Sequence, residues 1–271
     1  MTNAQDRPVA LVTGASSGFG LATAARLHQL GYHVVGTSRR AEATGPDGVE
    51  MVVLDVDRDD SVAACVAEVV ARTGRIDVVV NNAGRALVGA CEETSADEAR
   101  ALFETNLFGV MRVTSAVLPT MRARRHGAIV NVGSLSGFIG VPFHGVYAAT
   151  KHALAGYSEA LRYEVARFGI RVALIEPAAH RTGIQMARPR RPLAVYDPGR
   201  DAVEQVIRAQ IDGGRAPGHV VDAIVRAATG RTRRFRRRVG GAKAVLAVVA
   251  RLFPGWLFDR VVRREFRLDG R

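Results

Sequence analysis

The chain has 271 residues, of which 48% are hydrophobic and 24% are charged, and these proportions are typical of a folded globular protein. The 28 glycines follow no triplet period, which excludes a collagen-like chain. The balance of 38 Lys and Arg residues against 26 Asp and Glu residues gives a formal net charge of +12, and only Lys151 and Lys243 are lysines. The length suits one large domain or two small ones, and because no clear second domain is seen along the chain we expect a single domain spanning residues 1–271.

The positive charge is concentrated in the second half of the chain. Residues 1–135 carry 13 basic and 15 acidic side chains, whereas residues 136–271 carry 25 and 11. Six of these arginines lie between Arg231 and Arg238. Such a cluster is typical of a surface that binds nucleic acid, anionic lipid or an anionic cofactor, and equally of a solvated face. We expect no nucleic-acid partner, because only Phe235 interrupts the cluster with a ring for base stacking.

Cysteines and apolar runs indicate the cellular setting. The two cysteines, Cys65 and Cys91, are too few for a disulfide framework and lack metal-ligand spacing, so we expect no metal site. The residues before the first strand signal are too few for a secretory leader. No apolar run reaches the roughly 20 residues that a membrane-spanning helix needs. We therefore expect a cytoplasmic protein.

Short β-branched runs alternate with helical patterns along the chain. The predicted strands are Val9–Thr13, His33–Ser38, Glu50–Asp55, Asp77–Asn81, Ala128–Gly133 and Arg171–Glu176. The predicted helices are Gly20–Leu30, Ser61–Thr73, Asp97–Arg124, Tyr147–Phe168, Asp201–Ile211 and His219–Thr229. Apolar strands separated by helices indicate an α/β fold with a doubly wound parallel sheet of the Rossmann type. Such a sheet binds its ligands at the carboxyl ends of its strands.

Three later segments depart from this alternation. Residues 182–215 begin with an Arg- and Pro-rich stretch, which predicts either an insertion that covers the substrate or a solvent loop. The run Phe235–Gly240 predicts an edge strand whose arginines face water. Residues 241–271 form an apolar tail with interspersed arginines.

A glycine-rich turn follows the first predicted strand. Gly14, Gly18 and Gly20 have the spacing Gly-x-x-x-Gly-x-Gly and precede a helix. Glycines at such a turn let the backbone approach a pyrophosphate, and the helix N-terminus supplies free N–H groups. A tight structural turn would explain the same glycines.

The end of the second predicted strand indicates which dinucleotide binds. NAD sites place a carboxylate about 20 residues after the glycine turn, where it binds the ribose 2′-hydroxyl. This chain has Ser38 there, followed by Arg39 and Arg40. Guanidinium groups bind a 2′-phosphate that a carboxylate would repel, so these residues favour NADP. The alternative is two solvated arginines.

Tyr147 and Lys151 lie four residues apart at the start of a predicted helix, so they share one helix face. An unperturbed tyrosine has a pKa of about 10, and a neighbouring cation favours its phenolate form. A neutral tyrosine at the same place acts as a general acid toward a carbonyl oxygen. Ser134 ends the preceding predicted strand.

The sequence resembles the short-chain dehydrogenase/reductase family over about residues 8–182. The resemblance rests on TGASSGFG, LDV at 54–56, NNAG, ETNLFG, Ser134, YAATK and Pro177 with Thr182, in that order and spacing. The apolar tail resembles the branch that contains hydroxysteroid and retinol dehydrogenases.

The resemblance implies roles for matching residues. Tyr147 would be the catalytic acid/base, Lys151 would lower its pKa and hold the nicotinamide ribose, Ser134 would bind the substrate oxygen, and Asn106 would anchor a proton-relay water. Taken singly, Ser134 and Asn106 are more often capping residues. The implied cofactor contacts are Gly14, Ser16, Ser17, Phe19, Gly20, Ser38, Arg39, Arg40, Asp55, Val56, Asn82, Ala83, Gly84, Tyr147, Lys151, Pro177 and Thr182.

One position departs from the family pattern. The family commonly has Pro-Gly where this chain has Pro177 and Ala178, and alanine enters the positive-φ region less easily, so the loop after this strand would differ. Apolar residues near the catalytic segment either line a hydrophobic substrate site or pack in the core: Leu87, Val88, Phe138, Ile139, Val141, Pro142 and Phe143.

These observations predict an NADP(H)-dependent oxidoreductase that interconverts a ketone and a secondary alcohol on a hydrophobic small molecule. The alternative is a non-catalytic NADP-binding redox sensor or regulator. Family resemblance implies a homodimer or homotetramer. The tail would cap the substrate cleft, pack on a second subunit or make a peripheral membrane contact.

Overall fold

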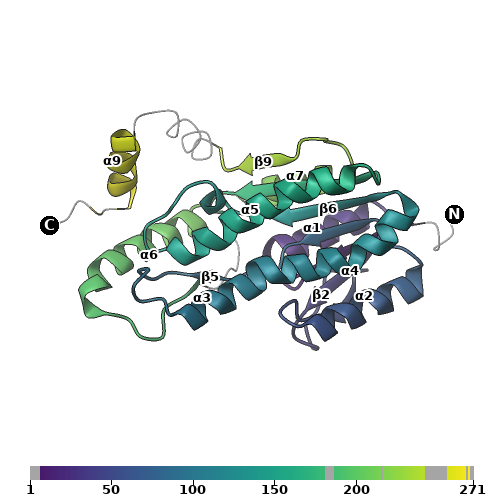
Figure 1. The fold of residues 1–271 in the computed structure, drawn as a ribbon, viewed down its shortest axis with the longest axis horizontal. Coiled ribbons are helices and arrows are strands. Elements are labelled where there is room, and N and C mark those ends of the chain that lie inside the picture. The colour runs from purple at the N-terminus through teal and green to yellow at the C-terminus, as the bar shows by residue number, and fades with distance from the viewer. Residues whose placement is uncertain (1–6, 181–185, 215, 242–254, 267, 269–271) are drawn as a thin grey trace.

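The computed structural model describes residues 7–180, 186–214, 216–241, 255–266 and 268. Its centre is a seven-stranded sheet in the order β3-β2-β1-β4-β6-β7-β9 (Figure 1), in which all neighbouring strands are parallel. The order reverses between β1 and β4, and a doubly wound sheet binds its ligand at such a point. The predicted Rossmann-type fold is confirmed. The strands are β1 (Val9–Val12), β2 (His33–Ser38), β3 (Glu50–Val53), β4 (Val78–Asn81), β6 (Gly127–Val132), β7 (Ile170–Pro177) and β9 (Arg236–Val239).

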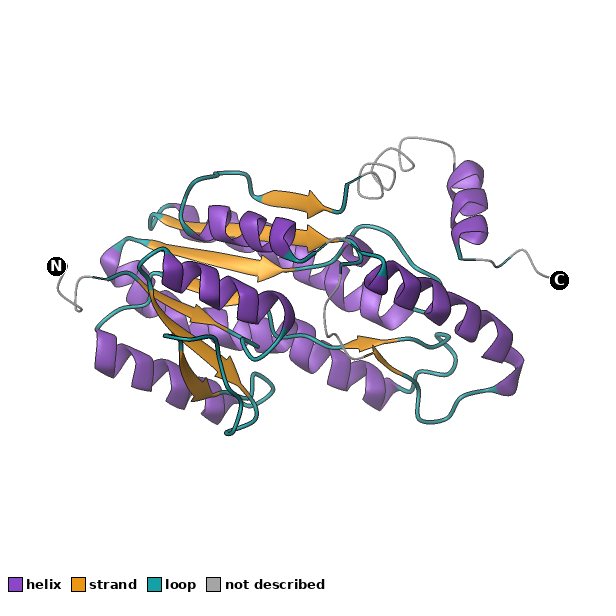
Figure 2. Ribbon diagram, turned by 180° about the vertical axis from the view of Figure 1, so that it is seen from behind, coloured by secondary structure: helices purple, strands orange, loops and turns teal. Residues whose placement is uncertain are grey.

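The central strands are apolar along their whole length because helices cover both faces of the sheet. One core cluster joins the sheet to α1 (Gly18–Gln29) and α7 (Gly218–Ala228), for example through Leu27 and Ile224. The other joins it to α2 (Asp59–Thr73), α4 (Gly109–Arg124) and α5 (Gly145–Ala166). Figures 1 and 2 show these two helical layers from opposite sides.

The segment predicted as one helix over Asp97–Arg124 is divided, which corrects that prediction. α3 (Ala96–Phe103) begins with a capping box between Ser95 and Glu98, and α4 follows a π-helical turn, η2 (Glu104–Phe108). The π turn contains the buried Asn106. Such turns insert one residue into a helix and are frequent at functional sites.

The insertion is only partly described, since residues 181–185 and 215 lie outside the described part. β8 (Met186–Ala187) pairs in parallel with β5 (Ala86–Leu87), η4 (Ala194–Tyr196) follows, and α6 (Asp197–Asp212) begins earlier than predicted. Of the tail, the described part includes α9 (Gly255–Glu265), which lies beyond α6 at the upper left of Figure 1. Phe266 is buried against Val203 and Ile207 of α6. None of the described helices is both long enough and apolar enough to span a bilayer.

β9 is an edge strand, as predicted, but the expectation that its arginines face water is wrong for two of them. Arg236 and Arg238 lie beside Glu176, a buried carboxylate of β7, whereas Arg237 is exposed. The alternation of a strand sends neighbouring side chains to opposite faces, and one face of β9 lies against this buried charge.

Candidate active site

Ser134, Tyr147 and Lys151 come together at the carboxyl end of β6. Ser134 begins the short 3₁₀ turn η3 (Leu135–Gly137), and its Oγ accepts a hydrogen bond from Ser136 N at 3.1 Å. Tyr147 and Lys151 lie in the first turns of α5, and both are buried. Lys151 Nζ lies 5.9 Å from the centroid of the Tyr147 ring and donates to Val132 O at 3.1 Å. The structure therefore brings the predicted catalytic residues together.

The pKa values of this group follow from burial. Burial raises the pKa of Tyr147, and a hydrogen bond from the Ser134 hydroxyl opposes that rise. Burial lowers the pKa of Lys151 to about 8. The contact that favours the tyrosinate is thus made by Ser134, and the role of Lys151 in lowering the tyrosine pKa stays a prediction.

Asn106 is fully buried, and its side chain ties three elements together. Its Nδ2 donates to Arg85 O at 2.9 Å and to Thr150 Oγ1 at 3.1 Å, while its Oδ1 accepts from Arg85 N at 2.8 Å. Thr150 Oγ1 in turn donates to Tyr147 O at 2.7 Å. The π turn therefore connects to the helix that carries Tyr147. Thr150 was not predicted as a site residue, although it lies within YAATK.

The glycine turn and the end of β4 form one unit. Asn82 Nδ2 donates to Thr13 O at 3.0 Å and to Gly14 O at 3.1 Å, and Thr13 Oγ1 accepts from the N–H groups of Asn82 and Ala83. Asn82 thus holds the glycine turn in shape. Thr13 was not predicted as a site residue either; its place before Gly14 was the available signal.

The glycine turn presents backbone N–H groups without side-chain partners among the described residues at the start of α1. Gly14 and Gly18 have positive φ, and Ser17 is the N-cap of α1 but makes no side-chain capping bond. Ser16 and Phe19 are partly buried beside it. Gly84 is exposed, and a Cβ on it would lie 3.8 Å from Lys151 Nζ. A bound pyrophosphate would fit this arrangement because the first N–H groups of α1 have no side-chain partner.

The ends of β2 and β3 lie beside the glycine turn. Ser38 is buried and its Oγ accepts from Arg40 N at 3.2 Å, while the side chains of Arg39 and Arg40 are exposed. Within the described residues, no hydrogen bond or ion pair engages either guanidinium group. Asp55 Oδ1 accepts from Asp57 N at 3.1 Å, which shapes the turn after β3. The buried Val56 lies in the same turn.

The loop after β7 is described only in part, and Thr182 lies outside the described residues. Ala178 N donates to Val239 O at 2.7 Å. Among described non-glycine residues only Arg125 and Phe143 have positive φ, so Ala178 follows Pro177 without that conformation.

His144 is a site residue that was not predicted from the sequence. It is buried, its ring meets that of Tyr147 edge to face at 5.2 Å, and its Nε2 has no partner among the described residues. Burial lowers the pKa of His144 to about 4, so the ring is neutral near pH 7. The preceding Phe143 adopts φ 57°, an uncommon conformation for a bulky residue. The position of His144 three residues before Tyr147 was the only signal.

The predicted substrate-lining residues lie in different surroundings. Leu87 packs with Leu102 and Tyr147, and the partly buried Met186 joins this cluster. Val88, in contrast, packs against α6 together with Val141 and Phe143, so these three serve the core that holds the insertion. Phe138 lies under the guanidinium group of Arg238.

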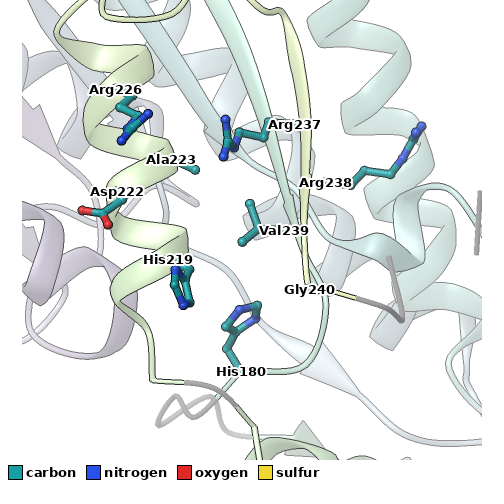
Figure 3. Close-up of a pocket in the computed structure, with 10 residues that line it drawn as sticks. His180, His219, Asp222, Ala223, Arg226, Arg237, Arg238, Val239 and Gly240 are labelled. Carbon is teal, nitrogen blue, oxygen red and sulfur yellow. The ribbon is translucent and has the colours of Figure 1, made fainter. Parts of the chain in front are cut away.

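A separate cleft of about 310 Å³ lies between α7 and β9 (Figure 3). Its lining includes His180, His219, Asp222, Arg226 and Arg237. His180 is buried and its ring meets that of Phe19 at 5.9 Å. The cleft therefore lies behind the glycine turn and does not include Tyr147.

Comparison with known proteins shows which family has this arrangement of residues. The family model described as short chain dehydrogenase matches residues 8–192, which include Gly14, Ser134, Tyr147 and Lys151. The 3-ketodihydrosphingosine reductase of Bacteroides thetaiotaomicron is 36% identical over 267 residues, covering 96% of this chain and 97% of that protein. The chain is a short-chain dehydrogenase/reductase.

Further relatives of this oxidoreductase agree with that assignment. Human retinol dehydrogenase 8 is 41% identical over 181 residues, which cover 62% of this chain and 57% of that protein. A crystal structure of a short-chain dehydrogenase from Streptomyces avermitilis has a TM-score of 0.84 and 38% identity, with 97% of each chain covered. A variant of actinorhodin polyketide ketoreductase, solved with NADPH, has a TM-score of 0.75 and 32% identity, and the match covers 89% of this chain and 98% of that one. The expected likeness to retinol dehydrogenases is confirmed.

Proposed function

We propose that this short-chain dehydrogenase/reductase uses NADP(H) to interconvert a ketone and a secondary alcohol on a hydrophobic small molecule. The observation that carries this proposal is the group of Ser134 with the buried Tyr147 and Lys151 at the end of β6, together with a glycine turn at the start of α1 whose N-cap makes no side-chain capping bond. When bound, the cofactor supplies or accepts the hydride.

In the reducing direction, the chain's own residues handle the oxygen and its proton. The Ser134 hydroxyl donates to the substrate oxygen and stabilises the negative charge that develops there. Tyr147 gives its phenolic proton to the same oxygen as a general acid. Burial keeps the pKa of Tyr147 raised, so the proton is present at neutral pH before the reaction. In the oxidising direction, Tyr147 takes the proton back.

The remaining polar residues of the site act around this pair. Lys151, whose ammonium group is aimed at Val132 O, would hold the ribose hydroxyls of the nicotinamide. Asn106 would hold a water that passes protons toward Lys151, although its described hydrogen bonds go to Arg85 and Thr150. Gly14, Ser16, Ser17, Phe19 and Gly20 would hold the pyrophosphate. Asp55 and Val56 would contact the adenine. Asn82, Ala83 and Gly84 would contact the centre of the cofactor, and Pro177 and Thr182 would contact the nicotinamide.

Arg39 and Arg40 support a preference for NADP(H). Both guanidinium groups are exposed at the end of β2, and Ser38 replaces the carboxylate that an NAD site needs. A 2′-phosphate at this place would gain charge-assisted hydrogen bonds. The likeness to a ketoreductase solved with NADPH agrees with this preference.

An apolar substrate is supported by the surroundings of Tyr147. Its ring packs with Leu87, Leu102 and Met186, and these side chains favour a hydrophobic body beside the reacting carbonyl. The relatives named for 3-ketodihydrosphingosine and retinol are named for apolar compounds. α6 and the end of the tail, joined through Phe266, would cover this side of the site.

We also propose a cytoplasmic homodimer or homotetramer. Large apolar side chains are exposed on the outer helical segments, among them Phe108 and Met111, and a second copy would bury them. α9 exposes Trp256 beside arginines, which favours a reversible contact of the tail with a membrane surface.

A panel of hydrophobic ketones and secondary alcohols, followed at the absorbance of NADPH, tests the proposal. We expect turnover by the natural enzyme and a loss of about 10²–10⁴-fold in Tyr147→Phe, because the substitution removes only the phenolic oxygen. Tyr163→Phe, on the exposed side of α5, is the control. Full turnover in Tyr147→Phe would contradict the assigned role. Tight NADPH binding without turnover on the whole panel would favour the redox-sensor alternative.

A further inference from the structure

β9 presents two arginines with different surroundings at the edge of the sheet. Figure 3 shows Arg237 and Arg238 extending to opposite sides of this strand. Arg237 is exposed in the cleft beside α7. The side chain of Arg238 is 21% exposed and reaches toward β7 and the turn after β6. Both arginines line this cleft, but it is Arg238 whose guanidinium group lies over the ring of Phe138, four residues after Ser134.

Arg238 makes two contacts of different kinds. Its Nε lies 3.0 Å from Oε2 of Glu176, and its guanidinium carbon lies 3.8 Å from the centroid of the Phe138 ring. Glu176 is 1% exposed, and a buried carboxylate is costly unless a cation compensates it. Arg236 lies farther away, with its Nε 3.7 Å from the other carboxylate oxygen. Arg238 is thus the closer of the two cations to Glu176, and a guanidinium group over a ring is a favourable contact.

The Arg238–Glu176 pair touches both ends of the segment that carries Ser134. At its start, Gly133 N donates to the carbonyl oxygen of Ile175, the neighbour of Glu176 in β7, at 2.7 Å, and a Cβ placed on Gly133 would lie 3.4 Å from Glu176 Cγ. At its end, Phe138 lies under Arg238. Between them the chain is a tight turn, in which Gly137 N donates to Ser134 O at 2.9 Å. A shift of either end would therefore move Ser134.

We propose that Arg238 and Glu176 are a positioning pair that fixes the turn of Ser134, so that its hydroxyl stays directed at Tyr147. This inference rests on the proposed function of Ser134 and Tyr147. Neither member of the pair is assigned contact with substrate or cofactor; both act through the residues that flank Ser134. Loss of Arg238 would remove its contact with the Phe138 ring and leave the Glu176 carboxylate without its nearer cation.

Arg238→Met tests the pair, with Arg237→Met on the opposite face of the same strand as the matched control. We expect kcat of Arg238→Met to fall about tenfold or more, because small displacements of a catalytic group are costly, while KM for NADPH changes less than about twofold. Arg237→Met should match the natural enzyme in both. Arg238→Lys, which keeps the charge but loses the flat guanidinium group over Phe138, should fall between them.

The pH profile of alcohol oxidation adds a readout that a purely structural role would not move. Ser134 opposes the burial-raised pKa of Tyr147, so a displaced Ser134 raises that pKa further. The rising limb of kcat/KM should therefore move to higher pH in Arg238→Met. The described ionisable groups facing Tyr147 are Lys151 and His144, and both are unchanged in this variant.

Hydrogen exchange of the peptide spanning residues 133–138 tests the pair without any substrate. We expect faster exchange in Arg238→Met than in Arg237→Met. Equal exchange, kcat and pH profile in these two variants would overturn the inference. Absence of turnover in the natural enzyme would instead contradict the proposed function. In that case the exchange result alone would decide whether Arg238 and Glu176 position the turn of Ser134.

A double variant separates positioning from simple stability. Glu176→Gln combined with Arg238→Met removes both charges, so it should recover much of the thermal stability lost by Arg238→Met alone. If the pair positions Ser134, kcat stays low in the double variant because the contact between Arg238 and Phe138 is still missing. Recovery of kcat together with stability would show that the pair is only a stabilising ion pair.

Discussion

Lys151 Nζ donates a hydrogen bond to the carbonyl oxygen of Val132, the last residue of β6, at 3.1 Å. This bond ties the helix that carries Tyr147 to the strand that leads into Ser134, so it holds the proposed acid close to the residue proposed to bind the substrate oxygen. The lysine is buried there, and burial lowers its pKa to about 8. Its charge is therefore present at neutral pH and is lost under mildly alkaline conditions.

Replacing Lys151 with arginine should reduce kcat about a hundredfold, because the larger planar group does not fit the place of a compact ammonium. In the natural enzyme, kcat/KM for carbonyl reduction should fall as the pH rises through about 8, where the pKa of Lys151 lies. An arginine does not titrate there, so this limb should vanish from the residual activity of Lys151→Arg. Steady-state rates between about pH 6 and 10 measure both effects. A limb that persists unchanged in the variant would assign it to another group.

Arg39→Ser should weaken NADPH binding about 10- to 100-fold, the worth of a hydrogen bond to a charged group, and leave NADH binding unchanged. The reason is that the exposed guanidinium group at the end of β2 would meet only the 2′-phosphate. Isothermal calorimetry with both dinucleotides measures the difference. Arg226→Ser, which replaces an exposed arginine of α7, is the control. Equal affinities of the natural enzyme for NADPH and NADH would refute the role of Arg39.

His144→Phe should make the protein less sensitive to acid. Burial holds the pKa of His144 at about 4 in the folded state, below the value of about 6.5 in an unfolded chain. The unfolded state therefore binds the proton first as the pH falls, and folding stability drops between about pH 6.5 and 4. Because the variant lacks this titration, its unfolding free energy should fall by about 3 kcal/mol less than that of the natural chain over that range.

Urea unfolding at a series of pH values measures the effect. The difference in unfolding free energy between His144→Phe and the natural chain should change with pH only over this window. His219→Phe replaces an exposed histidine and serves as the control. Parallel curves for all three proteins would contradict the prediction.

Gly20→Ala should destabilise the protein by about 1–3 kcal/mol and weaken NADPH binding, because the added methyl group has no space. A Cβ on Gly20 would overlap the carbonyl oxygen of Gly14 and lie 2.5 Å from Asn82 Nδ2. Gly156 lies within α5 with nothing within 4 Å of its Cβ position, so Gly156→Ala should stabilise by about 0.5–1 kcal/mol. Thermal melts with and without NADPH compare the two. Similar effects of both substitutions would show that the glycine turn tolerates side chains.

The alternation of apolar strands and helical patterns was enough to predict the sheet, its parallel direction and the edge at which the site lies. The motifs were enough to place Gly14, Ser134, Tyr147 and Lys151 together, because each lies at the end of a strand or the start of a helix and parallel strands end at one edge. These features depend on periodicity and on residues close together in the chain, and both can be read directly from a sequence.

Contacts between distant segments were decided only by the tertiary structure. The sequence shows Asn106 within a helical pattern, but only the structure shows that it lies in a π turn and that its side chain bonds the backbone of Arg85, 21 residues earlier. Likewise, nothing local distinguishes Arg238 from Arg237. Their difference arises because strand alternation faces one of them toward Glu176 on a neighbouring strand, and the cost of burying that carboxylate draws the cation inward.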